Sequence, residues 1–291
     1  MTEALIFEAA INGATSKAVN PNVPRTVAEI VASARGCLEA GAAIIHNHNE
    51  EGLIHGRHAS EPYREAWTQV YANCPDAVLY PTMGGGGAHT NIRERYAHIE
   101  ELADAGVLRV TLIDPGSLNI APIGSAGPPV AIDFAYQNTF ADVRYMIDVC
   151  KGRNLAASVS IFEPGFLRLA LAYHAAGELP PAKIQLYFGG PALMFGLPPT
   201  TASLDAYIDM LAESGLPWMV AVLGGNVAKS LAELAIERGG HVRVGLEDYA
   251  GPGTPRNEVL VKEIADMARR HGRALATPAE AATILGVPEA R

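Results

Sequence analysis

The sequence predicts a (β/α)₈ barrel, the fold in which eight parallel strands alternate with eight helices. Three observations indicate it: short β-rich runs alternate with longer helical patterns along the chain, each kind occurs eight times, and 291 residues suit such a barrel. An open, doubly wound sheet is the other architecture that this alternation allows. Such a sheet often carries GxGxxG after its first strand, and Ile11-Asn12-Gly13-Ala14-Thr15 lacks that pattern. We expect one barrel domain over residues 1–291, because no Pro/Ser-rich linker divides the chain.

The strands are expected where short aliphatic runs lie between turn-forming residues. In chain order these runs are Leu5–Ile11, Ala43–His48, Ala77–Thr82, Leu108–Ile113, Ala156–Ile161, Lys183–Phe188, Trp218–Leu223 and Val242–Leu246. The helices are expected between them, where apolar residues recur at helical spacing. The first follows a capping box, Thr26-Val27-Ala28-Glu29, and runs to about Leu38. The others cover residues 60–73, 90–104, 139–152, 165–176, 203–213, 227–238 and 256–271.

Three further segments complete the expected fold. Thr277-Pro278-Ala279-Glu280 is another capping box with Pro at the first helical position, and it predicts a short extra helix that ends near Leu285. Two long loops rich in Gly and Pro, residues 114–138 and 189–200, follow strands. In a barrel such loops form the active face, so we expect a lid there.

Composition excludes several classes of protein. Hydrophobic residues make up 49% of the chain and charged residues 18%, which argues against disorder. The net charge of −9 argues against a nucleic-acid surface, which needs a basic stripe. No apolar run approaches the roughly 18 residues of a membrane span, and the N-terminus carries acids where a signal peptide carries bases. With three scattered cysteines (Cys37, Cys74 and Cys150), we expect a cytoplasmic protein without nucleic-acid or membrane partners.

The second expected strand ends in a candidate metal site. His46 and His48 are two residues apart, so they share one face at the carboxyl end of the strand. Two imidazoles that face a barrel mouth can chelate one metal ion, and zinc is the ion that such sites usually bind. The alternative is that both histidines make ordinary hydrogen bonds in a polar mouth.

The last expected strand supplies a third ligand. Val242, Val244 and Leu246 would face the helices, which leaves Arg243, Gly245 and Glu247 facing the interior or its mouth. Strand eight and strand two both flank strand one in a closed barrel, so Glu247 can reach the two histidines. A metal ion held by two nitrogen ligands and one oxygen ligand still has open coordination positions, which is typical of a catalytic metal site. A structural Arg–Glu pair is the alternative for Arg243 and Glu247.

At this point the sequence resembles a known family, the β-keto acid cleavage enzymes. The resemblance runs from about residue 5 to the C-terminal ATPAEAATIL. Its segments are INGAT, AGAAIIHNH, the turn Pro81-Thr82-Met83-Gly84-Gly85, DPGSLN and GGHVRVGLEDY. It implies a zinc-bearing barrel, usually a homo-oligomer and by resemblance a tetramer. It also implies transfer of an acyl group from a β-keto acid to acetyl-CoA, which gives acetoacetate and a new acyl-CoA.

The resemblance also assigns residues by position. His46, His48 and Glu247 resemble the zinc ligands, Asp248 the acidic partner beside them, and Arg243 the active-site arginine. Thr82 stands where the family has a substrate-binding Ser, and Gly85 matches a Gly whose backbone approaches the substrate. Thr15 stands where the family has the acid that holds the substrate's amino group.

Departures from the family pattern bear on the substrate. The Arg that usually follows HxH is absent, since Asn49 and Glu50 follow here. Leu223-Gly224-Gly225-Asn226 lacks the family's Arg in the turn after the seventh strand. With Thr15 in place of an acid, we expect a neutral or apolar β-keto acid rather than an aminated one.

Taken together, the residues and the resemblance predict a metal-dependent acyltransferase. Zinc is the expected cofactor, although another divalent metal can fill the same ligand set. Asp248, with Arg243 beside it, is the expected base, and Glu8 either supports the metal site or pairs with an interior Arg or Lys. Two other functions remain: a metal-dependent aldolase or C–C hydrolase acting on a dicarbonyl compound, and a barrel that binds a small acid without turnover.

Overall fold

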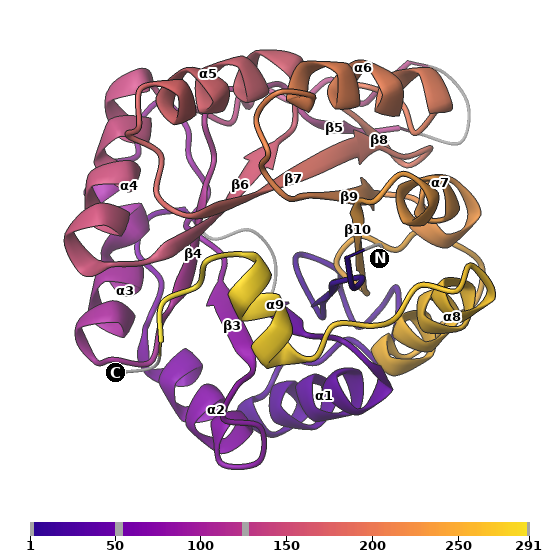
Figure 1. Ribbon diagram of the computed structural model, residues 1–291. Helices are drawn as coiled ribbons and strands as arrows, with labels where there is room; N and C mark the ends of the chain where they lie inside the picture. Colours follow the sequence, from indigo (N-terminus) through magenta and orange to yellow (C-terminus); the bar gives the residue numbers. More distant parts are fainter. Residues whose placement is uncertain (1–2, 50–54, 124–127, 290–291) are drawn as a thin grey trace.

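The computed structural model describes residues 3–49, 55–123 and 128–289. Its main sheet has eight parallel strands in the order β3-β2-β1-β10-β9-β7-β6-β4. The terminal strands of this order, β3 and β4, lie beside each other, so the sheet forms a nearly closed barrel (Figure 1). The strands are β1 (Phe7–Ala10), β2 (Ile44–Asn47), β3 (Val78–Pro81), β4 (Val110–Ile113), β6 (Ala156–Ile161), β7 (Ala182–Gly189), β9 (Trp218–Leu223) and β10 (His241–Val244).

Helices surround this barrel, as the alternating pattern predicted (Figure 1). They are α1 (Val27–Ala40), α2 (Glu61–Tyr71), α3 (Ile92–Asp104), α4 (Phe140–Arg153), α5 (Pro164–Ala175), α6 (Thr201–Leu211), α7 (Ala232–Glu237) and α8 (Asn257–Arg270). The capping box before α1 is confirmed, because Thr26 and Glu29 exchange side-chain and backbone hydrogen bonds. The predicted helix over 227–238 is divided into a 3₁₀ turn, η1 (Val227–Lys229), and α7. None of the helices within the described ranges is long and apolar enough to span a membrane.

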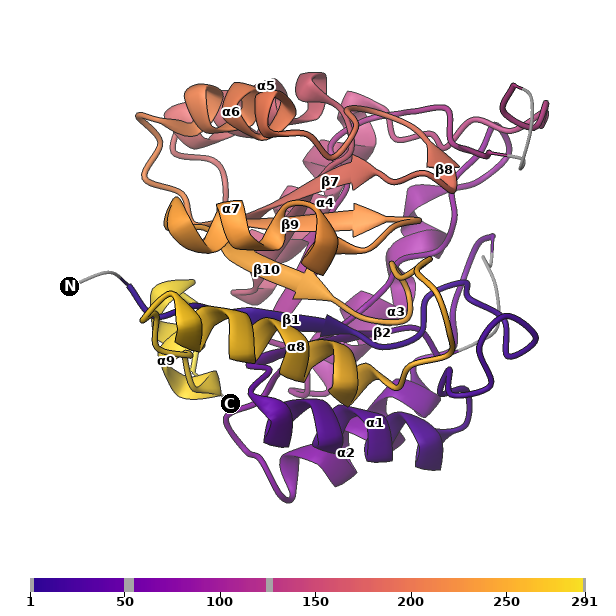
Figure 2. The same cartoon turned by 90° about the vertical axis from the view of Figure 1, so that its right-hand side faces the viewer.

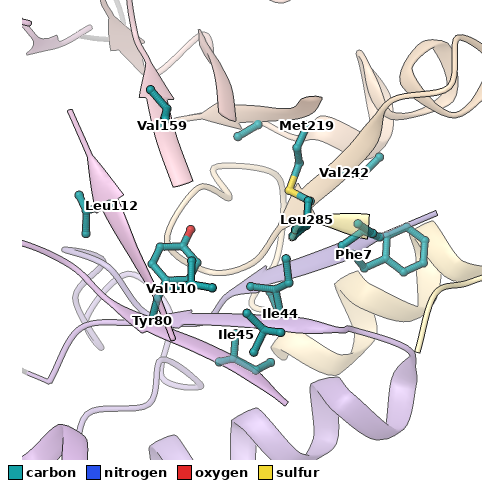
Figure 3. Close-up of a cluster of buried hydrophobic side chains, with 14 of the residues drawn as sticks. Phe7, Ile44, Ile45, Tyr80, Val110, Leu112, Val159, Met219, Val242 and Leu285 are labelled. Carbon is teal, nitrogen blue, oxygen red and sulfur yellow. The ribbon is translucent and has the colours of Figure 1, made fainter. Parts of the chain in front are cut away.

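The extra C-terminal helix is present as α9 (Pro278–Ile284), with Thr277 as its capping residue. Leu275, just before it, forms a parallel bridge with Leu5 ahead of β1. Figure 2 shows α9 at the amino ends of the strands, opposite the arrowheads. Figure 3 shows Leu285 in one buried cluster with residues of β1, β2, β9 and other strands. The helix therefore covers the end of the barrel that lies away from the mouth.

The two long mouth loops are joined to each other. Short strands in each, β5 (Ala121–Pro122) and β8 (Leu193–Met194), pair antiparallel with Ala121 opposite Met194. The sequence predicted irregular loops here, because two-residue strands carry no periodic pattern. The pairing lies beyond the carboxyl end of the barrel (Figure 2) and connects the segments that follow β4 and β7.

Candidate active site

The candidate metal ligands come from two strands that flank β1. Residue pairs in register are Ala10 with His46 on one side of β1 and Glu8 with Arg243 on the other. His46 and His48 therefore face the interior beside β1, and Glu247 follows β10 at the same end of the barrel. The predicted convergence of the three residues is confirmed, since one candidate ligand atom from each lies within 4.8 Å of the others.

The distances between these atoms suit one bound ion. The Nε2 atom of His46 lies 3.3 Å from Oε2 of Glu247, and Nε2 of His48 lies 3.6 Å from Oε1 of the same carboxylate. Two ligands bonded at about 2.1 Å with a tetrahedral angle between them are about 3.4 Å apart. The set of two imidazoles and one carboxylate therefore fits a zinc ion or a similar divalent metal.

The electrostatics of the set also suit a cation. Burial lowers the pKa of His48, which favours the neutral imidazole that binds metals. Burial raises the pKa of Glu247, but the Arg243 guanidinium and the two histidines outweigh it and bring the pKa well below its usual range. Oε2 of Glu247 is buried and has no hydrogen-bond partner among the described residues. Its lone pairs are therefore available to coordinate a metal ion.

The end of β10 differs from the sequence prediction, which extended the strand to Leu246. The strand ends at Val244, and a turn follows in which the Asp248 and Tyr249 amides donate to the Gly245 carbonyl. Gly245 has φ +151°, and a Cβ there would lie 2.0 Å from the carbonyl oxygen of Ala10. Because of this turn, the adjacent residues Glu247 and Asp248 both reach Arg243, which strict strand alternation does not allow.

Arg243 connects the acidic residues of the site. Its Nε and Nη2 donate to the two carboxylate oxygens of Asp248, both at 2.9 Å, and Nη2 also lies 3.0 Å from Oε1 of Glu247. Nη1 donates to Glu8 at 3.1 Å. The predicted Arg–Glu pair is therefore present, and it is part of a larger cluster.

Asp248 is buried, and Arg243 takes both of its oxygens. Burial raises the pKa of the Asp248 carboxyl, and the adjacent Arg243 opposes that rise. Among the described residues, its side chain bonds Arg243 rather than the backbone of the following loop. The Asp248 backbone carbonyl does accept hydrogen bonds, from the amides of Gly224 and Gly225.

Two asparagines hold the backbone around the ligands. Asn12 bonds both the amide and the carbonyl of His48 and also accepts from the Gly13 amide. A Cβ at Gly13 would lie 2.2 Å from Cγ of Glu247, so only glycine fits against that ligand. Asn257 accepts from the Leu246 amide and donates to the Ile11 carbonyl. No role was predicted for either asparagine, although the alternation of the first strand puts Asn12 on the same face as Glu8.

The substrate-binding candidates lie around the same mouth. Thr82 follows Pro81, which is in register with Asn47, so Thr82 lies next to His48 in the barrel rim. Its carbonyl accepts a hydrogen bond from Nε2 of His98 at 2.7 Å. Gly85 is buried and forms a parallel bridge with His55.

Thr15 and Asn49, which depart from the family pattern, have side chains that are fixed by hydrogen bonds to backbone carbonyls. The Thr15 hydroxyl donates to the Leu246 carbonyl at 2.7 Å, directly before Glu247. Asn49 is buried and donates to the Ala59 carbonyl at 2.8 Å. The other departure that follows HxH, Glu50, lies outside the described residues.

Comparison with known proteins finds relatives over nearly the whole chain. A model of the beta-keto acid cleavage enzyme family matches residues 4–287. The 3-keto-5-aminohexanoate cleavage enzyme of Fusobacterium nucleatum is 30% identical over 99% of this chain and 99% of its own length. The 3-oxoadipate:acetyl-CoA acetyltransferase of Cupriavidus necator is 28% identical over 99% of this chain and 96% of its own.

Solved structures support the fold. The ternary complex of ObcA with a C4-CoA adduct and oxalate matches with a TM-score of 0.67 and 16% identity, over 92% of this chain and 68% of that one. This likeness shows the barrel alone. The match of the family model over nearly the whole chain shows more: the chain belongs to the β-keto acid cleavage enzyme family.

Proposed function

We propose that this protein is a zinc-dependent acyltransferase that cleaves a β-keto acid with acetyl-CoA and releases acetoacetate and an acyl-CoA. The observation that carries the proposal is the convergence of His46, His48 and Glu247 beside the Arg243–Asp248 pair. Membership in the β-keto acid cleavage family, and the acetyl-CoA named for three relatives, support it.

His46, His48 and Glu247 would hold the metal. When bound, a divalent ion supplies Lewis-acid polarisation of the substrate's keto carbonyl. The two imidazoles and the carboxylate leave open positions, which a catalytic site requires for its substrate. Asn12 keeps the His48 backbone fixed and so preserves the spacing of the set.

Asp248 is the base in this proposal. Carbon 2 of a β-keto acid lies between two carbonyl carbons, so its proton is acidic enough for a carboxylate to remove. Burial raises the pKa of Asp248 and strengthens it as a base, while Arg243 orients both of its oxygens. Arg243 also connects Asp248 to Glu247, so the base has a fixed position relative to the metal ligands.

The bond changes then follow in two stages. The carbanion at carbon 2 attacks the acetyl carbonyl of acetyl-CoA and expels the CoA thiolate. The thiolate attacks the keto carbon, the bond between carbons 2 and 3 breaks, and the electron pair returns to carbon 2, which takes back the proton held by Asp248 and gives acetoacetate beside the acyl-CoA. Thr82, in the barrel rim next to His48, and the backbone at Gly85 would stabilise the developing oxyanions.

A neutral or apolar β-keto acid is the substrate class that we propose. Relatives act on substrates of different charge: the name 3-keto-5-aminohexanoate cleavage enzyme denotes an aminated acid, and the name 3-oxoadipate:acetyl-CoA acetyltransferase denotes a dicarboxylic acid. Thr15 offers no carboxylate to an ammonium group, and its hydroxyl proton already bonds Leu246. We further propose a cytoplasmic homo-oligomer, a tetramer by resemblance, which light scattering of the purified protein can test.

A metal analysis joined to a substrate screen tests the proposal. Purified protein would be analysed for bound metal and then incubated with a panel of β-keto acids, with and without acetyl-CoA. Acetoacetate that forms only with acetyl-CoA supports the acyltransferase. Cleavage without acetyl-CoA would indicate an aldolase or C–C hydrolase instead, and tight zinc binding without turnover on the panel would indicate a binding protein.

A further inference from the structure

The barrel interior beneath the metal ligands contains a buried group of charges. Glu8 and Lys183 are 0% and 2% exposed and come from strands β1 and β7, which are not neighbours in the sheet. Nζ of Lys183 lies 2.8 Å from Oε2 of Glu8 and donates to Oε1 of Gln185, also at 2.8 Å. Two buried charges are costly unless they are paired, so this pair has to be accounted for by structure or by function.

Glu8 contacts two cations and a phenol. Its Oε1 accepts hydrogen bonds from the Tyr80 hydroxyl at 2.5 Å and from Nη1 of Arg243 at 3.1 Å, while its Oε2 faces Lys183. Burial raises the pKa of Glu8, but Lys183, Arg243 and His46 outweigh it and lower the pKa to about 2. This low pKa favours the ionised carboxylate of Glu8 at neutral pH.

On one side, Glu8 fixes the guanidinium of Arg243. The Nη1 edge of Arg243 bonds Glu8, and the other edge bonds Asp248 and Glu247. The guanidinium also lies over the ring of Tyr187, with Cζ 5.1 Å from the ring centroid. An arginine held on opposite edges and on one face has little freedom to rotate.

On the other side, Glu8 fixes the ring that packs on His46. The Tyr80 hydroxyl bonds Glu8, and the Tyr80 ring lies 4.6 Å from the His46 ring, centroid to centroid. His46 and Tyr80 are in register on β2 and β3. One carboxylate therefore contacts both the residue that packs on a candidate metal ligand and the residue that orients the candidate base.

We propose that Glu8 is a positioning residue that aligns the two halves of the site, His46 through Tyr80 and the Glu247–Asp248 pair through Arg243. The proposal rests on the proposed function for the roles of those three residues. Lys183 serves as the counterion that anchors the free oxygen of Glu8. The contrasting interpretation is that Glu8 only neutralises Lys183 in the barrel interior.

A double variant distinguishes the two interpretations. Glu8→Gln alone leaves Lys183 buried without a countercharge, whereas Glu8→Gln combined with Lys183→Met removes both charges at once. Lys183→Met alone is the matched control, since it leaves Glu8 bonded to Tyr80 and Arg243. Each protein would be measured for unfolding free energy, for the zinc affinity of its metal-free form by chelator competition, and for kcat and KM.

We expect the double variant to regain most of the unfolding free energy that Glu8→Gln loses. Compared with the wild type, it should still bind zinc about tenfold more weakly. Its kcat should fall about tenfold or more, with little change in KM for acetyl-CoA. Lys183→Met should keep zinc affinity close to that of the wild type. Wild-type zinc affinity and kcat in the double variant would overturn the proposal, even if Glu8→Gln alone does not fold. Absence of turnover by the wild-type protein would contradict the proposed function instead, and the zinc titration would still decide the role of Glu8.

Discussion

Asn12 bonds the backbone of His48 on both sides: its Oδ1 accepts from the His48 amide at 2.8 Å, and its Nδ2 donates to the His48 carbonyl at 2.7 Å. The two residues lie at the carboxyl ends of the adjacent strands β1 and β2. These two hydrogen bonds from a buried asparagine fix the backbone position from which the His48 imidazole extends, before any metal is bound.

Asn12→Ala should therefore weaken the metal site and the fold together. Loss of these bonds leaves buried backbone groups of His48 without partners, which costs about 2–3 kcal/mol of unfolding free energy. We expect zinc affinity to fall about tenfold as well. Chelator competition and urea unfolding measure the two effects. Asn20→Ala, which removes a buried asparagine bonded to the Pro255 carbonyl, should change stability but leave zinc affinity unchanged.

His46→Ala should remove bound metal and keep the fold. The residue contributes one of three candidate ligands, and mouth residues of barrels seldom carry stability. We expect zinc content to drop below about a tenth of the wild-type value. The circular dichroism spectrum of the metal-free protein should not change. Exposed His174 provides the control, and equal zinc loss in His174→Ala and His46→Ala would refute the assignment.

Asp248→Asn should separate chemistry from metal binding. The amide cannot take a proton from carbon 2, so turnover should fall roughly 10²–10⁴-fold while zinc content stays near that of the wild type. The variant also loses one bond to Arg243, with an expected cost of about 1–3 kcal/mol. Turnover close to normal in zinc-loaded Asp248→Asn would exclude Asp248 as the base.

Thr15→Glu should shift the substrate preference toward aminated β-keto acids. The new carboxylate would sit directly beside Leu246 and the ligand Glu247, where an ammonium group can pair with it. We expect the ratio of kcat/KM for an aminated acid over its neutral analogue to rise about tenfold or more. Thr15→Gln matches the size without the charge. A wild-type enzyme that already prefers the aminated acid tenfold would contradict the proposed substrate class.

Acid should destabilise the protein through three buried histidines. Burial lowers the pKa of His58 to about 3, of His98 to about 4 and of His241 to about 3, from 6.5. Below pH 6.5 the unfolded chain binds protons that the folded protein does not, so stability falls as the pH drops toward 4. The loss is about 1.4 kcal/mol per pH unit for each histidine.

A variant of His241 measures how much this one histidine contributes to the pH dependence of the unfolding free energy. The Nδ1 atom of His241 accepts a hydrogen bond from the Ile6 amide at 3.1 Å, and the Oδ1 atom of Asn can replace it. His241→Asn should reduce the pH slope of the unfolding free energy by about 1.4 kcal/mol per unit between pH 6 and 4, measured in urea with a chelator present. The exposed His174→Asn variant should keep the wild-type slope, and an unchanged slope in His241→Asn would contradict the argument.

Sequence patterns predicted the barrel and the shared face of the two candidate metal-binding histidines because both depend on local spacing. His46 and His48 share a face by the alternation of a strand, and that face is the interior one. Glu247 lies beside the two histidines as expected, but it does so on a turn at Gly245 that replaces the expected end of the strand. That turn depends on close contact with Ala10 of β1, which no local pattern reports.

Other parts of the site depend on distant pairing. The Glu8–Lys183 ion pair forms across the interior between β1 and β7, and only the register of the closed barrel brings the two side chains together. Glu8 was expected either to support the metal site or to pair with an interior Arg or Lys, and the structure pairs it with Arg243 and Lys183. The β5–β8 pairing is also tertiary, because each strand is too short to have a period.

The pairing of β1 with β10 determines when the site can exist during synthesis. The two histidines lie in or directly after β2, whereas Arg243, Glu247 and Asp248 lie in or directly after β10, so the histidines leave the ribosome first. Until β10 docks on β1, the nascent protein has two imidazoles and no carboxylate beside them. The proposed ligand set is therefore incomplete until β10 docks, and a chain truncated before residue 241 carries both histidines without the site.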